Sequence, residues 1–109
     1  MVEEALLSAI LDSLKEPILI ADAEHVIRYM NRAAIEHYEG GASLIGRSLL
    51  DCHNERSQQK MKEILVALQA GADERLMSVD EKRRGFMCAV RDPQGRLLGY
   101  YERYEPVSG

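Results

Sequence analysis

The side chains with the clearest potential for chemistry are Cys52 and His53, which stand side by side in the middle of the chain. They come just before Asn54, whose side chain is well suited to cap the first turn of a helix. A neutral imidazole at such a place can bind a metal ion. It can equally satisfy its ring nitrogens by bonding to a backbone group. The sequence leaves both interpretations of His53 open.

A zinc site and a catalytic site both have little support. Zinc is held by clustered Cys and His side chains, and the second cysteine, Cys88, has no such cluster around it. There is no Ser-His-Asp spacing, no phosphate-binding glycine loop and no metalloprotease motif. Asp51 could form half of an acid–base pair with His53, but nothing marks a nucleophile. We therefore expect a protein that is not an enzyme.

The hydrophobic pattern predicts the elements that position these residues. An apolar stripe predicts a helix over 3–15, which Pro17 ends because the residue before a proline disfavours the helical region. A short helix is expected at 32–37, an irregular segment or a single helical turn at 44–50, and a longer helix from Asn54 to Gly71. Strands are expected at 17–22, 26–30, 74–80, 85–92 and 96–105. This order predicts an α+β fold, with a five-stranded antiparallel sheet and helices on one face.

Composition limits the class of protein. The chain has 109 residues, of which 46% are hydrophobic and 29% charged, which favours one compact domain. The net charge is −4 and no basic stripe is present, so we expect no direct nucleic-acid binding. The longest apolar run, residues 18–21, is far too short to span a membrane. Without a signal peptide, we expect a cytoplasmic protein with free thiols.

Three segments in order carry a family resemblance. Residues 20–31 read IADAEHVIRYMN, residues 45–47 read IGR, and residues 89–99 read AVRDPQGRLLG. They resemble the opening hairpin, a hydrophobic-Gly-Arg step and the closing hairpin of PAS sensory domains. His25 stands where many members have glycine. The resemblance extends from about Ser13 to Glu105 and implies the PAS fold and a role in signal transduction.

Within that family, the Cys-His step is similar to two subgroups. One comprises PAS domains found beside hemerythrin-like domains. The other comprises carbon-monoxide-responsive, haem-binding PAS regulators, which use a histidine at this helix start and a methionine on the following strand as axial ligands. The resemblance thus implies His53 and Met77 as candidate haem ligands, with no metal beyond the haem iron. Otherwise His53 bonds to a backbone group and Met77 fills the core.

Three functions stay open for such a domain. The first is haem sensing. The second is a different small ligand in a core pocket, for which the expected lining residues are Ile20, Ile35, Leu49, Leu65 and Met87. The third is a ligand-free module for dimerisation or protein interaction. The two remaining histidines, His25 and His37, are expected to face solvent.

The last expected strand carries large side chains on both faces, so a second layer must cover it. The N-terminal apolar stripe can do so within one chain or as part of a dimer, and we favour the dimer. We expect residues 1–15 to act as a flanking helix, residues 16–105 to form the PAS domain, and residues 106–109 to be a tail. The resemblance implies a homodimer that signals to a partner protein or a fused output domain. The expected interface residues are Leu7, Ile10, Leu11, Leu14 and Tyr100.

Overall fold

The computed structural model of the chain describes residues 2–107. It begins with helix α1 (Val2–Ser13), strand β1 (Leu19–Asp22), strand β2 (Ile27–Met30) and helix α2 (Arg32–His37). Two 3-10 turns follow, η1 (Gly41–Leu44) and η2 (Leu49–Cys52), and then the long helix α3 (Glu55–Gln69). The chain finishes with strands β3 (Glu74–Val79), β4 (Arg83–Arg91) and β5 (Leu97–Pro106).

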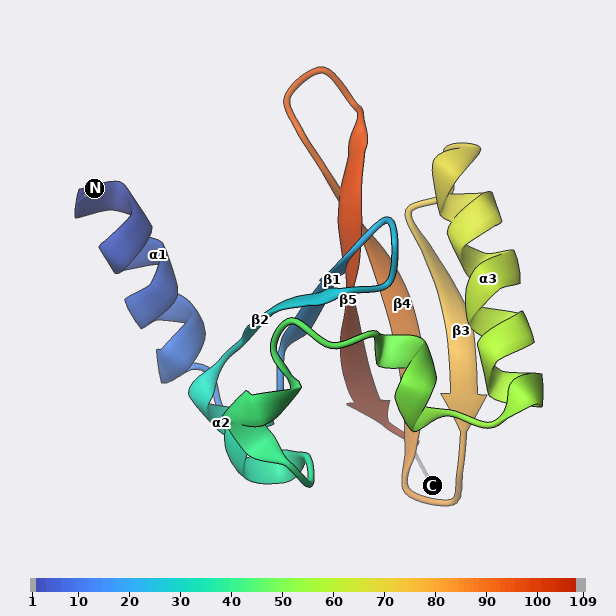
Figure 1. Cartoon of the computed structure of the whole chain (residues 1–109), viewed down its shortest axis with the longest axis horizontal. Helices are drawn as coiled ribbons and strands as arrows, with labels where there is room; N and C mark the ends of the chain where they lie inside the picture. The colour runs from blue at the N-terminus through green and yellow to red at the C-terminus, as the bar shows by residue number, and fades with distance from the viewer. Residues whose placement is uncertain (1, 108–109) are drawn as a thin grey trace.

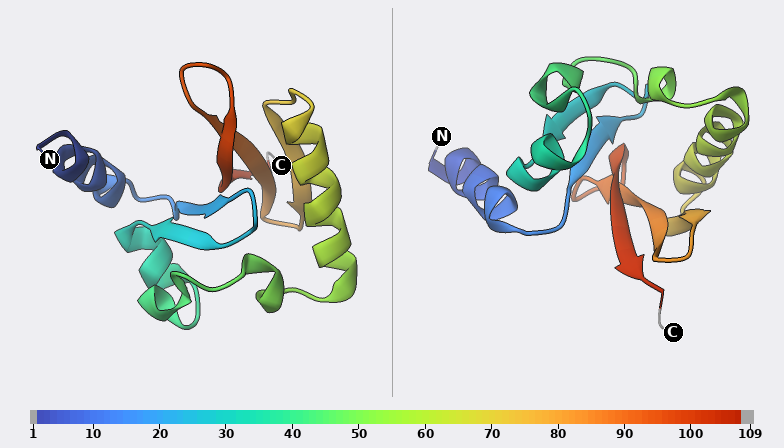
Figure 2. Two further views of the ribbon diagram at one scale, coloured as in Figure 1. Left: turned by 45° about the horizontal axis from the view of Figure 1, so that its top comes forward. Right: turned by 90° about the horizontal axis from the view of Figure 1, so that it is seen from below.

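The strands form one sheet in the order β2-β1-β5-β4-β3, and every neighbouring pair is antiparallel. Helices α2 and α3 and the two 3-10 turns lie on one side of it, whereas α1 projects from the edge beside α2 (Figures 1 and 2). This confirms the predicted α+β fold with helices on one face. The last strand, β5, lies in the centre, between the two hairpins.

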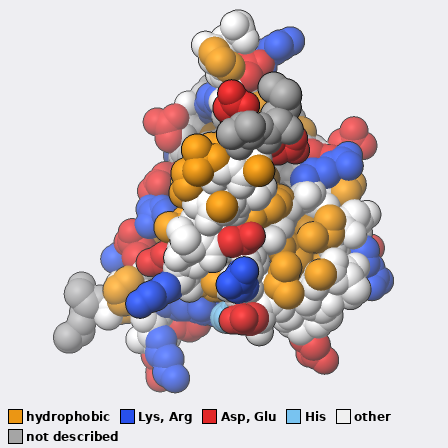
Figure 3. All heavy atoms as spheres, turned by 90° about the vertical axis from the view of Figure 1, so that its left-hand side faces the viewer, with side chains coloured by type: hydrophobic (Ala, Val, Ile, Leu, Met, Phe, Trp, Pro, Cys, Tyr) orange, Lys and Arg blue, Asp and Glu red, His pale blue; other side chains and the backbone are white. Residues whose placement is uncertain are grey.

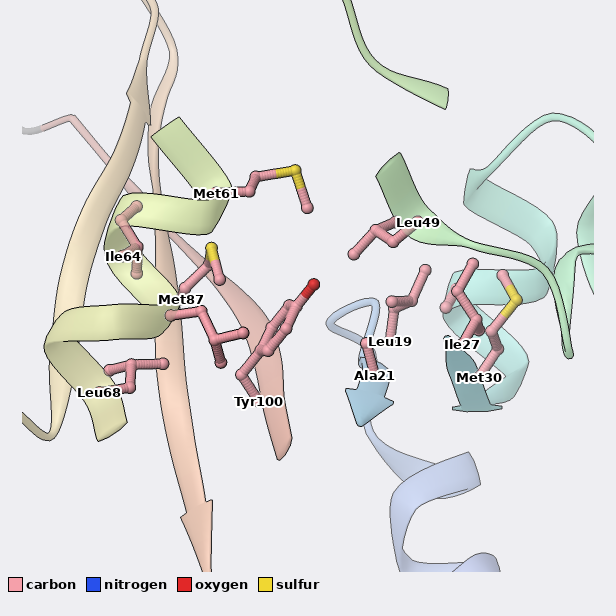
Figure 4. Close-up of a cluster of buried hydrophobic side chains, with 12 residues drawn as sticks. Leu19, Ala21, Ile27, Met30, Leu49, Met61, Ile64, Leu68, Met87 and Tyr100 are labelled. Carbon is pink, nitrogen blue, oxygen red and sulfur yellow. The ribbon is translucent and has the colours of Figure 1, made fainter. Parts of the chain in front are cut away.

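The core lies between this helical layer and the sheet. Figure 4 shows Tyr100 of β5 in the middle of the cluster, between side chains of α3 and those of β1 and β2. Helix α3 contributes the apolar stripe that the sequence predicted: Met61, Ile64, Leu65 and Leu68. Asn54 caps this helix by accepting a hydrogen bond from the backbone N–H of Ser57 at 2.9 Å.

Element ends differ from the predicted ones by a few residues. Helix α1 ends at Ser13 and β1 begins at Leu19, so the segment around Pro17 is a connection between them. Strand β4 begins at Arg83, two residues earlier than predicted, because Asp80 closes a tighter turn. Its Oδ1 accepts hydrogen bonds from the backbone N–H groups of Lys82 and Arg83, both at 2.8 Å.

Asn31 joins helix α1 to the rest of the fold. It is fully buried, and its side-chain oxygen accepts hydrogen bonds from Ile18 N and Ala34 N, both at 2.9 Å. Its side-chain nitrogen donates to the carbonyls of Leu11 at 2.8 Å and Glu16 at 3.0 Å. One side chain thus holds the end of α1, the start of β1 and the first turn of α2. Among residues 2–107, no helix has the length and apolar character needed to cross a membrane.

Candidate functional site

Two cavities meet in the space between the sheet and the helical layer. One has a volume of about 170 Å³ and lies between α3 and strands β3 to β5. The other has a volume of about 260 Å³ and lies toward η1, η2 and strands β1 and β2. Three residues line both cavities: His53, Glu102 and Tyr104. They form a shared polar wall, which we take as the centre of the candidate site.

The position of His53 follows from two caps. Ser48 caps η2, because its hydroxyl accepts from Leu50 N at 3.2 Å, and Asn54 caps α3, so the histidine lies in the single step between them. The side-chain amide of Gln58 bridges the two elements: it donates to the carbonyl of Leu50 at 2.9 Å and to that of His53 at 2.8 Å. The backbone at His53 is therefore held on both sides.

The ring of His53 makes one hydrogen bond that sets its chemistry. Its Nδ1 lies 2.8 Å from the carbonyl oxygen of Leu49, and because a carbonyl only accepts, Nδ1 is the donor. In the neutral ring, Nε2 then carries the lone pair. His53 lines both cavities, so this nitrogen can accept a hydrogen bond or bind a metal there. Both interpretations that the sequence left open are compatible with this geometry.

Glu102 is the acidic group at the centre of the site. It projects from the inner face of β5 and is only 8% exposed. Its Oε2 accepts a hydrogen bond from the hydroxyl of Tyr104 at 3.0 Å. The hydroxyl of Tyr38 lies 3.1 Å from that of Tyr104. Because Tyr104 donates its proton to Glu102, Tyr38 must donate to Tyr104, and the three groups form one directed chain of hydrogen bonds.

Burial controls the acidity of all three groups. Loss of hydration raises the pKa of Glu102 above its usual value, against the lowering effect of its hydrogen bonds and of His53. Burial, with the nearby carboxylate, raises the pKa of Tyr104 to about 12 and raises that of Tyr38 further. Both phenols therefore stay protonated at neutral pH and serve as hydrogen-bond donors.

The structure places His53 and Met77 in the wall of the same cavity, the smaller one. Met77 comes from β3 and is half-buried, and the exposed Lys60 stands at the α3 side of the opening. Among the predicted pocket residues, Leu49 lines the larger cavity. Leu65 and Met87 are buried in the core beside the cavities without lining either one.

Two predicted pocket residues lie elsewhere. Ile20 points to the outer face of the sheet, because strand alternation turns its neighbours Leu19 and Ala21 inward. Ile35 is 36% exposed on α2, because Ala34 is the residue of this short helix that is buried against the core. The expectation that these two residues line the core pocket is wrong.

His25 and Tyr100 also differ from expectation. Tyr100 is fully buried on the inner face of β5, so it cannot belong to an interface on the outer face. His25 is 6% exposed rather than facing solvent, and its Nδ1 lies 2.7 Å from the hydroxyl oxygen of Tyr100. His37, by contrast, is exposed at the end of α2, as predicted.

The other predicted interface residues lie on the surface. Leu7 is 61% exposed, Ile10 is 49% exposed and Leu14 is 39% exposed. Figure 3 looks onto the side of the molecule that carries α1 and shows hydrophobic side chains exposed there among charged ones. An apolar groove of about 340 Å³ connects this helix with the outer face of the sheet and is lined by Leu11, Leu14, Ile18, Ile20 and Tyr101.

Glu102, Tyr104 and Tyr38 are the site residues that sequence reasoning missed. A signal was present: Tyr100, Glu102 and Tyr104 alternate along one strand face, so a glutamate stands between two large aromatic residues. No cluster of three or more His, Cys, Asp or Glu side chains able to hold a metal ion occurs among residues 2–107.

Comparison with known proteins agrees with this architecture. The family model described as PAS domain matches residues 7–105. The C-terminal domain of a protein from Streptococcus mutans is 25% identical, with a TM-score of 0.76 over 98% of this chain and 85% of that chain. The PAS domain of BvgS from Bordetella pertussis is 16% identical, with a TM-score of 0.72 over 100% of this chain and 89% of that one. No protein with a curated description matches.

The chain therefore belongs to the PAS domain family, whose members are generally sensory and signalling domains. The same fold occurs in a sensor histidine kinase from Vibrio cholerae, at 16% identity and a TM-score of 0.66 over 99% of this chain and 94% of that chain. It also occurs in the Aer2 receptor of Vibrio cholerae, described as a dual PAS-heme oxygen sensor. That similarity has 16% identity and a TM-score of 0.58 over 85% of this chain and 95% of that chain.

Proposed function

We propose that this PAS domain is a non-enzymatic sensor that binds a small ligand at the wall formed by His53, Glu102 and Tyr104. The observation that carries the proposal is Glu102, an ionisable side chain buried where two cavities meet. A buried carboxylate reduces stability unless its hydrogen-bonding capacity is used. Cavities with a few converging polar groups are the usual form of a small-molecule site.

Strand β5 offers a direct route from this site to the surface. Its side chains alternate, so Glu102 and Tyr104 face the cavities while Tyr101 and Arg103 face the outer side of the sheet. Tyr101 lines the apolar groove beside Leu11 and Leu14 of the α1 segment. A shift of Glu102 on ligand binding would therefore move a residue of the proposed dimer surface.

The residues at the smaller cavity suit a haem iron only in part. His53 keeps Nε2 free and Met77 lies in the same wall, which matches a His and Met ligand pair. The space does not match: 170 and 260 Å³ are below the roughly 300–1,000 Å³ usual for drug-sized ligands. A porphyrin would also have to displace the buried Glu102. A small polar molecule fits these residues better.

A ligand-free interaction module is the second candidate. It is favoured by the exposed stripe of Leu7, Ile10 and Leu14, which is present whatever the cavities contain. Under either function, we propose a cytoplasmic homodimer in which residues 1–15 are the flanking helix, 16–105 the PAS domain and 106–109 a tail. The signal would pass to a partner protein or to an output domain.

Two measurements on the purified protein test these candidates. Native mass spectrometry should detect a small molecule that is lost on unfolding, and haem added to the protein should give only a broad absorption band that His53→Ala and Met77→Ala leave unchanged. A sharp Soret band that moves with carbon monoxide and disappears in His53→Ala would make haem the ligand. Absence of both signals in a protein that still dimerises would leave the interaction module.

A further inference from the structure

We propose that the ligand carries a protonated nitrogen, an amine or amidine, which binds the free oxygen of the Glu102 carboxylate. This inference rests on the proposed ligand-sensing function and specifies the class of molecule that the site accepts. Its basis is the set of contacts that Glu102 makes, and those that it lacks, at the wall between the two cavities.

The first step concerns the hydrogen bonds of the carboxylate. Tyr104 donates to Oε2, and Tyr38 donates to Tyr104, so both phenolic protons are already used within this chain of groups. Among the side-chain hydrogen bonds found within residues 2–107, the one that Glu102 accepts goes to Oε2, and none goes to Oε1. Because Glu102 lines both cavities, a ligand in either cavity can donate a hydrogen bond to that oxygen.

The second step concerns charge. None of the five ion pairs found within residues 2–107 includes Glu102. The adjacent Arg103 points to the outer face, where it binds Glu74 at 3.1 Å and Glu105 at 2.7 Å. A buried carboxylate outside any ion pair is costly, and a positively charged partner in the same low-dielectric space offsets much of that cost.

The third step concerns the groups that surround this carboxylate. Lys60 is the cation in the lining of the smaller cavity, but its side chain is exposed, so solvent screens its charge. His53 approaches from the η2 side and keeps Nε2 as an acceptor when neutral. A ligand nitrogen with more than one N–H can therefore donate to Glu102 and to His53 together. The aromatic ring of Tyr104 and the thioether of Met77 supply apolar contact for a short hydrocarbon body.

Binding of a cation should also change the protonation of Glu102. Burial favours the neutral form of Glu102 in the free protein, whereas a bound cation favours the ionised form. Any fraction of Glu102 that is protonated before binding must lose its proton when the cation binds. Binding should therefore release protons, which calorimetry detects by comparing buffers with different heats of ionisation.

The experiment uses matched pairs of probes. Butylamine, benzylamine and benzamidine are titrated into the protein beside butanol, benzyl alcohol and benzamide, and binding is followed by NMR and calorimetry. Wild-type protein should bind at least one cation roughly tenfold or more tightly than its neutral counterpart, as expected for one charge-assisted hydrogen bond. Proton release should accompany that binding.

Two variants assign the effect to the proposed group. Glu102→Gln keeps the shape of the side chain and should abolish both the preference for cations and the proton release. Glu105→Gln changes a glutamate of the same strand that is paired with Arg103 and Arg84 outside the cavities, and should leave both intact. Circular dichroism checks that each variant is folded.

Several results would overturn the proposal. Equal binding of cations and neutral molecules would do so, as would a preference for cations that persists in Glu102→Gln or the failure of every cation to bind. The proposed function is judged separately by native mass spectrometry. A neutral molecule found in the purified protein would overturn the ligand class and leave the sensory pocket in place.

Discussion

The Nδ1 atom of His25 lies 2.7 Å from the hydroxyl oxygen of Tyr100, and the two rings meet edge to face with their centroids 5.6 Å apart. His25 belongs to the turn between β1 and β2 and has a φ of 66°, a left-handed conformation that is uncommon for residues other than glycine. This conformation directs a turn side chain into the core. The hydrogen bond thereby ties the first hairpin to the central strand.

We expect Tyr100→Phe to lower the free energy of unfolding by about 1–2 kcal/mol, because it leaves a ring nitrogen of His25 unpaired in the core. Urea unfolding followed by circular dichroism measures this. A double-mutant cycle with His25→Asn should show coupling of about 1 kcal/mol. Additive effects of the two substitutions would contradict a direct interaction.

The same pair should make stability depend on pH. Burial, assisted by Lys62 and opposed by Asp22, lowers the pKa of His25 below its usual value of 6.5. The unfolded chain therefore takes up a proton at higher pH than the folded protein, so the free energy of unfolding falls as the pH drops below 6.5. The fall ends once the pH has passed below the lowered pKa of the folded state.

Unfolding measured between pH 8 and pH 5 tests this sign. His25→Asn is the matched variant, because asparagine tolerates the left-handed backbone and does not titrate. Other ionisable groups, Glu102 among them, affect both proteins alike, so the difference between the two curves isolates His25. Parallel curves would show that His25 does not contribute.

Glu102→Gln should raise the free energy of unfolding at pH 8, by about 1 kcal/mol, in protein without ligand. The buried carboxylate has a raised pKa, so the wild-type protein loses stability as the pH rises above the usual value of 4.5 and through the higher folded value. The amide carries no charge and avoids this loss. A variant less stable than wild type at pH 8 would mean that Glu102 holds the fold together instead.

Gly99 should be intolerant of any side chain. A Cβ atom at this position of β5 would overlap the carbonyl oxygen of Ala21 on the neighbouring strand β1. We expect Gly99→Ala to cost about 3 kcal/mol, measured by urea unfolding. Gly95→Ala is the control: it has open space around it and only the strain of its φ of 85°, so it should cost about 1 kcal/mol. An equal loss of unfolding free energy in the two variants would contradict the close approach of β5 to β1 at Gly99.

The exposed stripe of α1 should support self-association. Leu7→Glu replaces a side chain that is 61% exposed, so it should leave the stability of the monomer nearly unchanged and weaken the dimer roughly tenfold. Sedimentation equilibrium measures the dimer dissociation constant. The control is Val66→Glu, a 63% exposed apolar residue on the outer side of α3. A dimer weakened equally by both variants would place the interface elsewhere.

Elements with a strong local signal could be predicted from the sequence. Helix α2 begins and ends where the Asn31 cap and the following pattern predicted. Helix α3 follows its Asn54 cap and ends before Gly71, whose φ of 116° suits the glycine found there. The five strands also appear in the predicted places, because turn residues separate them clearly.

The faces of the strands were harder to predict, because they depend on pairing. Residues 18–21 are all apolar, so the pattern does not show which of them point inward. The register decides it: Ile20 lies opposite Tyr101 and Ala21 lies opposite Tyr100, on a strand about eighty residues further along the chain. Ile20 and Tyr100 were placed on the wrong faces for this reason.

The candidate site was predicted only in part for a similar reason. The sequence singled out His53 because its local setting at a helix start is visible there. Glu102 was missed, because a charged residue in a strand is normally expected on the surface. Its burial depends on Tyr38 and Tyr104, which only the folded chain brings together. His25 is buried by a contact with the same distant strand.

The central position of β5 sets the order in which this protein can fold. The β1–β2 and β3–β4 hairpins each involve neighbouring segments, but an isolated hairpin is at best marginally stable in water. Only β5 joins them, and its pairing with β1 spans most of the chain, which slows folding. During synthesis, the five-stranded sheet therefore cannot form until residues 97–106 have been made. Because the same strand carries Glu102 and Tyr104, the proposed binding site is created in the step that completes the fold.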